Sequence, residues 1–458
     1  MPWDRRSPAQ QKAAVAAALT TQVVDAVGPF SPYWRDRLKA LGRTAAQVAT
    51  VEGLASLPAV GERDVCPDGD PAGAAALVLQ ARESGWALHA EGPRLRQGLA
   101  RRLVRPGSYR TVVEADTRPT SFVLAGLALR FPVASTRRDL DVVARAGARL
   151  WQVLGLTRDD VLVAALPTGP TAALQGLQLG ALGAGAPALF PGDAPDEVAA
   201  ALRLVPATVL ALPSAAASRL VDDLDEAGAT LGSVTTVLLV GAPDDEERAE
   251  VAEALERAQV SARLLAVHVP DGHRLLWGEC APGHGLHTYP DLEHLELIDP
   301  ETGTASSTGE LVLTQLGMWG SALLRWRTAD LVTSLQTTAC PGCGRTVPRV
   351  LGARRAALVP HLSLRGGARG VDLRGVAAAL EGRADLADWR VLLSSSARDG
   401  ADEVVLHVTP AAGQDEADVA VAVARDVRQA AGLLPTQVVV TADLPTGEPL
   451  SRRVLTRR

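Results

Sequence analysis

Lysine is almost absent from this chain of 458 residues. Only Lys12 and Lys39 are present, and arginine supplies the rest of the positive charge. Any reaction that needs a lysine amine beyond residue 39 is therefore excluded. Asparagine is missing altogether, and isoleucine occurs once, at Ile298. This skew indicates a mutational bias toward GC-rich codons and does not by itself specify a fold.

Cysteine is also scarce, because four cysteines in a chain of this length are too few for a disulfide scaffold. The formal net charge of -6 gives no reason to expect nucleic acid or an acidic membrane as a partner. The most apolar stretch, residues 171–190, is broken by glutamines, glycines and Pro187 and is not expected to span a bilayer. The run after Arg5 and Arg6 lacks the cleavage site of a secretory signal. We therefore expect a cytoplasmic protein.

Apolar runs alternate with amphipathic segments between about residues 135 and 270. Thr136 and Asp139 have the spacing of a capping box, which predicts a helix start there. Continuous apolar strands that alternate with helices predict a parallel sheet covered on both faces. The predicted strands are 161–166, 188–190, 207–212, 234–240 and 263–269, and the predicted helices between them are 171–182, 196–204, 214–227 and 245–259.

The pattern becomes antiparallel after residue 285. Residues 292–298 and 309–316 flank a turn rich in Asp, Pro and Gly and predict a hairpin. The Gly- and Arg-rich stretch 352–370 predicts a linker. Beyond it we expect a helix (373–380), two strands (390–394 and 404–408), a helix (416–431) and a strand (437–441). The predicted fold class is α/β, with a large domain at 1–351 that combines parallel sheets and an antiparallel, barrel-like section, and a small α+β domain at 352–458.

The pair Cys340-x-x-Cys343 places two thiols on one tight turn. In a reducing compartment this pattern favours a metal over a disulfide. Tetrahedral zinc needs two more ligands, and Cys280 and His287 lie in the region against which this turn must pack. We predict a structural zinc on these four residues, with His284 as the alternative to His287. The simpler alternative is a buried apolar Cys280 and an empty C-x-x-C turn.

Several tracts follow one another in a fixed order along the chain. They are residues 31–35 (SPYWR), 136–140 (TRRDL), 278–280 (GEC), 285–287 (GLH), 296–303 (ELIDPETG), 309–314 (GELVLT), 325–330 (RWRTAD), 340–346 (CPGCGRT) and the tail 443–454. Together they resemble the phenylacetate–CoA ligase branch of the adenylate-forming ligases. The resemblance implies a large domain that binds ATP and a carboxylic acid to form an acyl-adenylate, and a small domain that rotates before CoA attacks. The four predicted zinc ligands look like the zinc site found in part of that family.

The residues that adenylation needs are mostly replaced. A triphosphate is held by backbone N–H groups and positive charge, but residues 121–132 keep one glycine of the family's phosphate loop, lose its hydroxyls and predict a buried strand. The family's Gly-Glu-Pro is Gly-Ala-Pro at 241–243, and no Tyr-Gly-x-x-Glu occurs near Val267. The family's C-terminal lysine aligns with Leu450.

Two nucleotide contacts of the family survive. Asp330 matches the residue that hydrogen-bonds the ribose, and Arg345 follows the C-x-x-C, so the resemblance implies cofactor binding at both. Binding of ATP, magnesium and CoA is nevertheless in doubt, because we expect Leu124, Leu127 and Leu129 to close the nucleotide end of the crevice.

Three functions are compatible with these patterns. The one we expect is a degenerate acid–CoA ligase homologue that acts as a binding or regulatory subunit. The others are an active AMP-forming aryl- or acyl-CoA ligase or acyltransferase with rebuilt chemistry, and a scaffolding interaction protein. The predicted partners are a small aryl or acyl carboxylic acid, in a crevice near Pro213, Ser214 and Gly241, and a protein partner.

Overall fold

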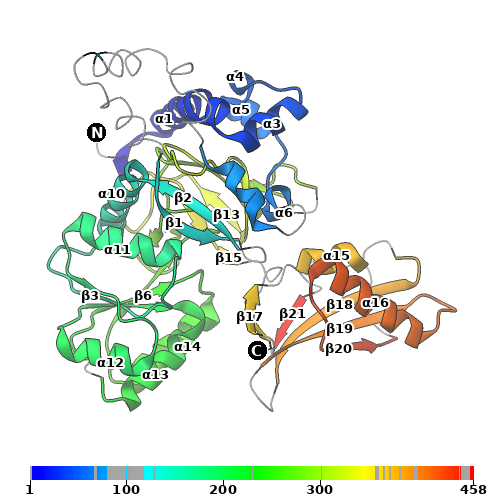
Figure 1. Ribbon diagram of the computed structural model, residues 1–458. Helices are drawn as coiled ribbons and strands as arrows, with labels where there is room; N and C mark the ends of the chain where they lie inside the picture. Colours follow the sequence, from blue (N-terminus) through cyan, green and yellow to red (C-terminus); the bar gives the residue numbers. More distant parts are fainter. Residues whose placement is uncertain are drawn as a thin grey trace. The chain divides into compact units, whose positions relative to one another are not determined.

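A computed structural model shows the fold of the chain (Figure 1). It describes residues 3–66, 70–79, 100, 103, 118–126, 130–229, 231–300, 302–355, 361–364, 367–370, 373–380, 383–396, 401–442, 444 and 454–457. The chain divides into two compact units. The first comprises Met1–Ala125 and Phe131–Arg354, and the second comprises Gly126–Arg130 and Arg355–Arg458. The sequence-based ranges 1–351 and 352–458 remain our proposed domains.

The first unit begins with short helices that follow the predicted capping signals. Ser7 and Gln10 form a capping box at the start of α1 (Pro8–Thr20), which continues through the π-helix η2 (Thr21–Val27) and α2 (Gly28–Phe30). Ser31 caps α3 (Pro32–Ala40). The 3-10 helix η1 (Trp3–Arg5) precedes them, and α4 (Ala45–Val48), α5 (Val51–Ala55), α6 (Glu62–Val65) and the 3-10 helix η3 (Pro71–Leu77) follow.

The continuous helical run Pro8–Phe30 is long and apolar enough to cross a membrane by length and composition. Its buried residues include Gln11, Val15, Leu19 and Val23, which lie on one face at helical spacing. The buried side chain of Gln22 donates a hydrogen bond to the carbonyl of Met318, at 2.7 Å. These contacts within the unit are those of a core helix in a folded protein.

The centre of the first unit is a nine-stranded sheet with the strand order β13-β14-β9-β8-β7-β6-β5-β3-β4. The neighbouring pairs from β4 to β7 are parallel, as the alternating pattern predicts, and the remaining pairs are antiparallel. The strands are β3 (Leu162–Ala164), β4 (Ala188–Leu189), β5 (Val209–Pro213), β6 (Thr236–Val240), β7 (Arg263–His268), β8 (Trp277–Glu279), β9 (Leu286–His287), β13 (Ser334–Gln336) and β14 (Arg349–Leu351).

Helices cover both faces of this sheet (Figure 1). On one face, α10 (Arg137–Leu154) and α11 (Ala172–Ala184) bury residues such as Leu150 against the strands. On the other face lie α12 (Pro195–Leu204), α13 (Ala217–Glu226), which follows the 3-10 helix η4 (Ser214–Ala216), and α14 (Asp245–Arg257). Alternate strand residues point to opposite faces, so Leu238 joins the first cluster and Leu239 the second. The predicted capping box of Thr136 and Asp139 starts α10.

A second sheet has the strand order β10-β11-β12-β15. The predicted hairpin forms from β10 (Glu293–Ile298) and β11 (Gly309–Gln315), and β12 (Trp326–Val332) and β15 (Arg354–Arg355) extend it. A separate hairpin pairs β1 (Pro119–Ala125) with β2 (Phe131–Thr136). The prediction of a buried strand at 121–132 is therefore wrong in part, because this tract supplies two paired strands and Phe122 is 50% exposed.

The second unit is an α+β unit with a four-stranded sheet in the order β20-β19-β18-β21. Its helices are α15 (Leu373–Leu380) and α16 (Glu416–Ala431), and its strands are β18 (Leu386–Ser395), β19 (Asp402–Pro410), β20 (Gln437–Val440) and β21 (Val454–Arg457). The linker predicted at 352–370 contains regular structure among its described residues. Short strands pair there as the hairpin of β16 (His361–Leu364) and β17 (Gly367–Gly370).

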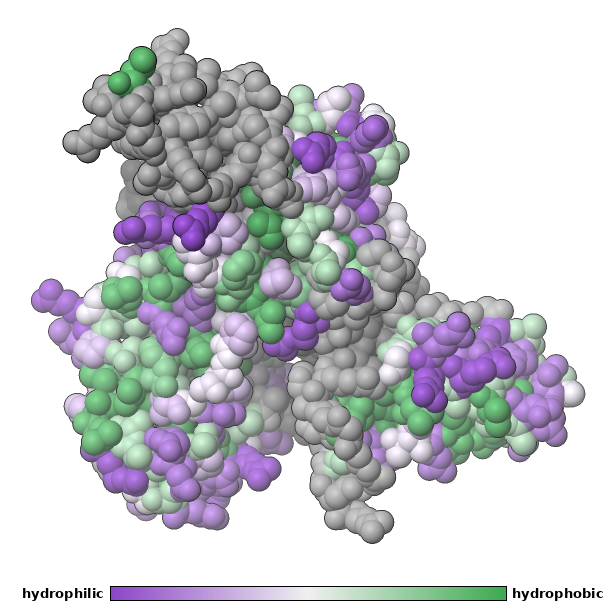
Figure 2. Space-filling model, viewed as in Figure 1, coloured by the Kyte–Doolittle hydropathy of each residue, from purple (hydrophilic) through white to green (hydrophobic). Residues whose placement is uncertain are grey.

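Hydrophilic and hydrophobic residues are interspersed on the face of the molecule drawn in Figure 2. Single large apolar side chains are exposed on the helices of the first unit, for example Leu182 and Leu204. Isolated exposed leucines are normal for a folded domain and do not by themselves mark an interface.

Candidate functional site

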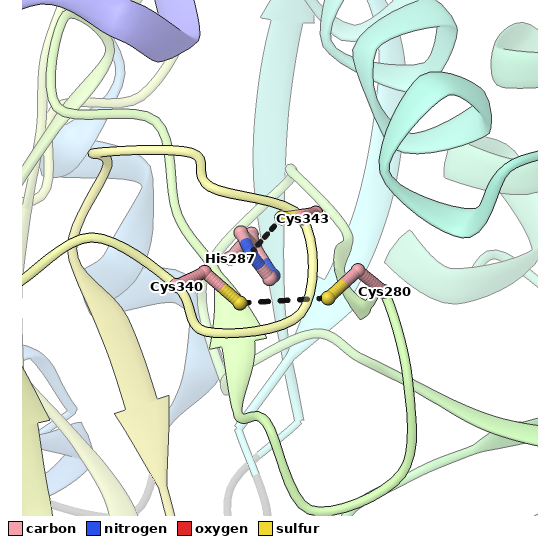
Figure 3. A group of neighbouring side chains, drawn as sticks. All are labelled: Cys280, His287, Cys340 and Cys343. Carbon is pink, nitrogen blue, oxygen red and sulfur yellow. Dashed lines mark hydrogen bonds between the residues drawn. The ribbon is translucent and has the colours of Figure 1, made fainter.

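The structure brings the four predicted zinc ligands together (Figure 3). One ligand atom from each of Cys280, His287, Cys340 and Cys343 lies within 4.8 Å of the others. Cys280 directly follows β8, and His287 ends β9, which pairs with β8. Cys340 and Cys343 lie on a turn closed by a hydrogen bond from the Gly344 N–H to the Cys340 carbonyl, at 2.8 Å. The adjacent antiparallel strands and this turn therefore supply two ligands each.

The spacing of these atoms fits tetrahedral zinc. Zn–S bonds of about 2.3 Å and Zn–N bonds of about 2.0–2.1 Å place two sulfurs about 3.8 Å apart, and a sulfur and a nitrogen about 3.6 Å apart. The Cys280 Sγ to Cys340 Sγ distance is 3.6 Å, and the Cys343 Sγ to His287 Nε2 distance is 3.3 Å. Small movements of the side chains would place all four at ligand distance from one ion.

His287 is oriented as a ligand by its second ring nitrogen. Nδ1 lies 3.3 Å from the carbonyl oxygen of Gly278, which can only accept, so Nδ1 carries the proton and Nε2 presents its lone pair to the cluster. Burial, with the charges of Arg345 and Arg349 adding to it, lowers the pKa of His287 to about 4. The imidazole is therefore neutral near pH 7, as a metal ligand must be.

The thiols favour a bound cation. Burial and hydrogen bonds to Cys340 and Cys343 raise the pKa of Cys280 to about 12, so this thiol ionises only if a positive charge is supplied. Burial alone would raise the pKa of Cys343, but hydrogen bonds from the backbone and side chain of Arg345, together with those to the other thiols, lower it overall. The surroundings thus favour the thiolate form at Cys343 and oppose it at Cys280.

His284, the alternative ligand, lies at the rim of the cluster. Its Nδ1 is 3.8 Å from Cys280 Sγ, and its backbone carbonyl accepts a hydrogen bond from Arg349. The geometry favours His287, whose Nε2 lies closer to a sulfur. Which histidine binds a metal stays a prediction.

Asp330, the predicted ribose contact, is fully buried on β12. Its Oδ2 lies 2.8 Å from Nε2 of His268 at the end of β7, and neither side chain is more than 3% exposed. The preceding residue, Ala329, has a φ of +57°, a conformation that favours glycine. The histidine therefore competes with any ribose hydroxyl for this carboxylate oxygen.

Arg345, the other predicted cofactor contact, is engaged elsewhere. Its Nε donates to Asp4 Oδ2 at 3.0 Å, and its Nη2 donates to the carbonyl of Gln152 at the end of α10. Asp330 and Arg345 share no hydrogen-bond partner among the described contacts. Cofactor binding at these two residues stays a prediction.

The segment that the sequence matched to the phosphate loop lies in the β1–β2 hairpin. The Leu124 N–H donates to the carbonyl of Pro170 at 2.7 Å, so this backbone group is already satisfied. The hydroxyl of Ser121 accepts from Gln175. Leu124 is half-buried, whereas Leu127 and Leu129, which we expected to close the crevice with it, lie outside the described residues.

A cavity of about 760 Å³ lies beside the carboxyl end of β6, where open parallel sheets commonly bind ligands. Ala242 and Pro243 line one side, with Ala266 of β7 and the ion pair of Arg248 and Glu279. Glu279 accepts from Arg248 Nη2 and from the Ala266 N–H, both at 2.9 Å. Sequence patterns did not single out this ion pair, because its partners are 31 residues apart and only Glu279 lies in one of the quoted tracts, residues 278–280.

The cavity is displaced from the crevice that the sequence predicted. Pro213, Ser214 and Gly241 are not among its lining residues. Gly241 has a φ of +150°, and a Cβ at this position would lie 2.3 Å from Ser214 Oγ. The loops after β5 and β6 therefore pack directly on each other, which leaves no room for a ligand between these two residues.

Known proteins were compared with the chain at the levels of sequence and structure. No family model and no curated protein matches the sequence. Among solved structures, 2-hydroxyisobutyryl-CoA ligase in complex with 2-HIB-AMP and CoA matches with a TM-score of 0.61 and 17% identity, over 99% of this chain and 91% of that chain. The same ligase in the postadenylation state with 2-HIB-AMP gives a TM-score of 0.59 and 16% identity, over 100% and 91% of the two chains.

Identities of this size establish the fold and leave the chemistry open. The match extends over both parts of the chain, and the predicted fold class, a large N-terminal α/β part and a smaller C-terminal α+β part, is confirmed. Assignment to the phenylacetate–CoA ligase branch stays a prediction. The chain has the fold of the adenylate-forming acid–CoA ligases.

Proposed function

We propose that this chain is a catalytically degenerate homologue of the acid–CoA ligases, close to their phenylacetate–CoA ligase branch, which binds a small ligand without adenylating it. The observation that carries the proposal is the buried pair of His268 and Asp330, in which one oxygen, Oδ2, of the carboxylate expected to hold a ribose is engaged by a histidine of the protein itself. No lysine follows Lys39, so no lysine can stabilise charge in a transition state at the C-terminal position. Losing one such donor costs about 3–4 kcal/mol of transition-state stabilisation.

The cavity beside β6 is the ligand site we propose. It is large enough for a small aryl or acyl carboxylic acid, since drug-sized ligand sites range from about 300 to 1,000 Å³. Its wall combines apolar residues with the Arg248–Glu279 ion pair, which offers both a donor and an acceptor. A binding or regulatory role needs only this cavity.

An active ligase is the second candidate, and its support is the structural match. The 2-hydroxyisobutyryl-CoA ligase holds 2-HIB-AMP and CoA in a fold that covers nearly all of this chain. In that case other groups replace the missing lysine and phosphate loop.

Acid-dependent exchange of pyrophosphate into ATP separates the two candidates. We expect no exchange above background with aryl or short-chain acids, while 2-hydroxyisobutyryl-CoA ligase, assayed in parallel with its own acid, gives a strong signal. Robust exchange with any acid, abolished by Asp330→Ala, would refute the degenerate assignment and establish the ligase.

We further propose one structural zinc per chain, held by Cys280, His287, Cys340 and Cys343. The metal would tie the β8–β9 pair to the C-x-x-C turn. Metal analysis of protein prepared without chelators tests this proposal. We expect one zinc per wild-type chain and none in Cys340→Ser, and a zinc-free wild type that remains folded would contradict it.

We also propose a cytoplasmic location. None of the four cysteines forms a disulfide, which supports a reducing compartment.

A further inference from the structure

The C-x-x-C turn is contacted by the segment of residues 3–11, more than 330 positions away in the sequence. The segment also makes an aromatic contact beside the turn. The ring of Trp3 lies 5.5 Å from the ring of Tyr289, and the guanidinium carbon of Arg149 lies 4.8 Å from the Trp3 ring centroid. Tyr289 is two residues beyond His287, so Trp3 packs beside the strand that carries a proposed ligand.

Arg5 contacts the turn itself. Its Nη1 donates to the carbonyl of Gly344 at 2.5 Å, and its Nη2 donates to the carbonyl of Cys343 at 3.2 Å. Gly344 has a φ of +66°, and a Cβ at this position would lie 3.0 Å from Arg5 Nη1. The turn therefore has the conformation and the open surface that this guanidinium needs.

The remaining residues of the turn also bind the segment. Arg345 Nε donates to Asp4 Oδ2 at 3.0 Å, and the Thr346 N–H donates to the Asp4 carbonyl at 2.9 Å. Gln11 Nε2 donates to the carbonyls of Arg6 and Thr346, both at 2.8 Å. Each residue from Cys343 to Thr346 thus has a partner in the segment.

We infer that residues 3–11 form a clamp whose docking is thermodynamically linked to metal binding by the C-x-x-C turn. The inference rests on the proposed zinc site. A metal holds the turn in the conformation that presents its carbonyls to Arg5, and the docked clamp holds the same conformation ready for the metal. Because such coupling is reciprocal, loss of the metal releases the clamp, and loss of the clamp weakens metal binding. Metal depletion would thereby expose a segment that is otherwise docked on the protein.

Hydrogen exchange of the full-length protein measures the first half of this linkage. The exchange of peptides that cover residues 3–11 and 340–346 is compared in zinc-loaded and chelator-treated protein, and zinc content is determined on the same samples. We expect the clamp peptide to exchange at least about tenfold faster without zinc, as for a coupling within the usual range of 5- to 150-fold. Peptides from α16, in the other unit, provide an internal control and should not change.

The variant Arg5→Ala measures the second half. It removes both hydrogen bonds from Arg5 to the turn and changes no proposed ligand. Zinc affinity, measured by competition with a chromophoric chelator, should fall about tenfold, as is usual when a residue that orients a metal ligand is removed. Arg6→Ala is the matched control. It removes the same charge from the next residue, and only the backbone carbonyl of Arg6 takes part in the described contacts, so zinc affinity should stay at the wild-type value.

The possible outcomes separate the clamp from the zinc site. Faster exchange without zinc and a selective affinity loss in Arg5→Ala support the linkage. One zinc per chain, with clamp exchange unchanged by chelation and equal affinities in Arg5→Ala and Arg6→Ala, overturns the linkage and leaves the zinc site intact. A folded wild-type protein that binds no zinc overturns both.

Discussion

Substitution of His268 tests whether its hydrogen bond to Asp330 keeps a ribose from binding this carboxylate. His268→Ala removes a buried imidazole whose Nε2 lies 2.8 Å from Asp330 Oδ2. A hydrogen bond to a charged group contributes about 1.5–3 kcal/mol, and deletion of a buried ring adds a cavity cost of about 1–2 kcal/mol. Asp330 is fully buried, so its carboxylate cannot turn to water in compensation. We expect the free energy of unfolding to fall by about 3 kcal/mol.

Urea unfolding followed by tryptophan fluorescence measures this loss, because seven of the eight tryptophans precede residue 352. The matched control is His268→Gln, whose amide can still donate to Asp330, and it should lose about 1 kcal/mol less than His268→Ala, the usual net value of one hydrogen bond. Equal losses in the two variants, or a loss below about 1 kcal/mol in His268→Ala, would refute the idea that the hydrogen bond holds this pair together.

The same variant tests the functional consequence of the pair. In wild-type protein, millimolar AMP should not shift the thermal unfolding midpoint, because Oδ2 is occupied. His268→Ala frees that oxygen and should gain a shift with AMP, and the added substitution Asp330→Ala should abolish it. An AMP-induced shift in wild-type protein that disappears in Asp330→Ala would show that the ribose site still works, and the closed-site reasoning would be wrong.

Three further predictions concern stability. Ala329→Gly should stabilise the protein by about 0.5 kcal/mol in urea unfolding, because the strain of φ +57° is about 1–2 kcal/mol and the added backbone entropy offsets about half of it; a destabilised variant would contradict this. Arg274→Ala should cost about 3–5 kcal/mol, since the buried guanidinium donates to the Ala134 and Ser321 carbonyls and lies beside Asp139, and near-wild-type stability would rule out this role. Burial lowers the pKa of His294, so the folded state resists protonation and stability should decrease as pH falls below about 6.5, less steeply in His294→Gln. Identical pH profiles in the two proteins would exclude that contribution.

Local sequence signals were sufficient for most of the secondary structure. The capping boxes at Ser7 and Thr136 and the alternating apolar runs between residues 135 and 270 specify helix starts, strands and the parallel sheet, because hydrogen bonding and burial at short range depend on neighbouring residues. The grouping of Cys280, His287, Cys340 and Cys343 also followed from sequence. Two ligands share a turn, and the other two lie near one pair of adjacent antiparallel strands.

Only the tertiary structure decided which partners Asp330 and Arg345 have. Asp330 matches a ribose contact by motif, but its oxygen pairs with His268, 62 positions earlier, and Arg345 pairs with Asp4, 341 positions earlier. The hairpin of β16 and β17 was missed for a related reason, since its glycines and arginines have the composition of a linker. Sequence patterns indicate which interactions a residue is able to make. Which partner satisfies a buried charge depends on contacts between distant segments, and those contacts form only when the chain is folded.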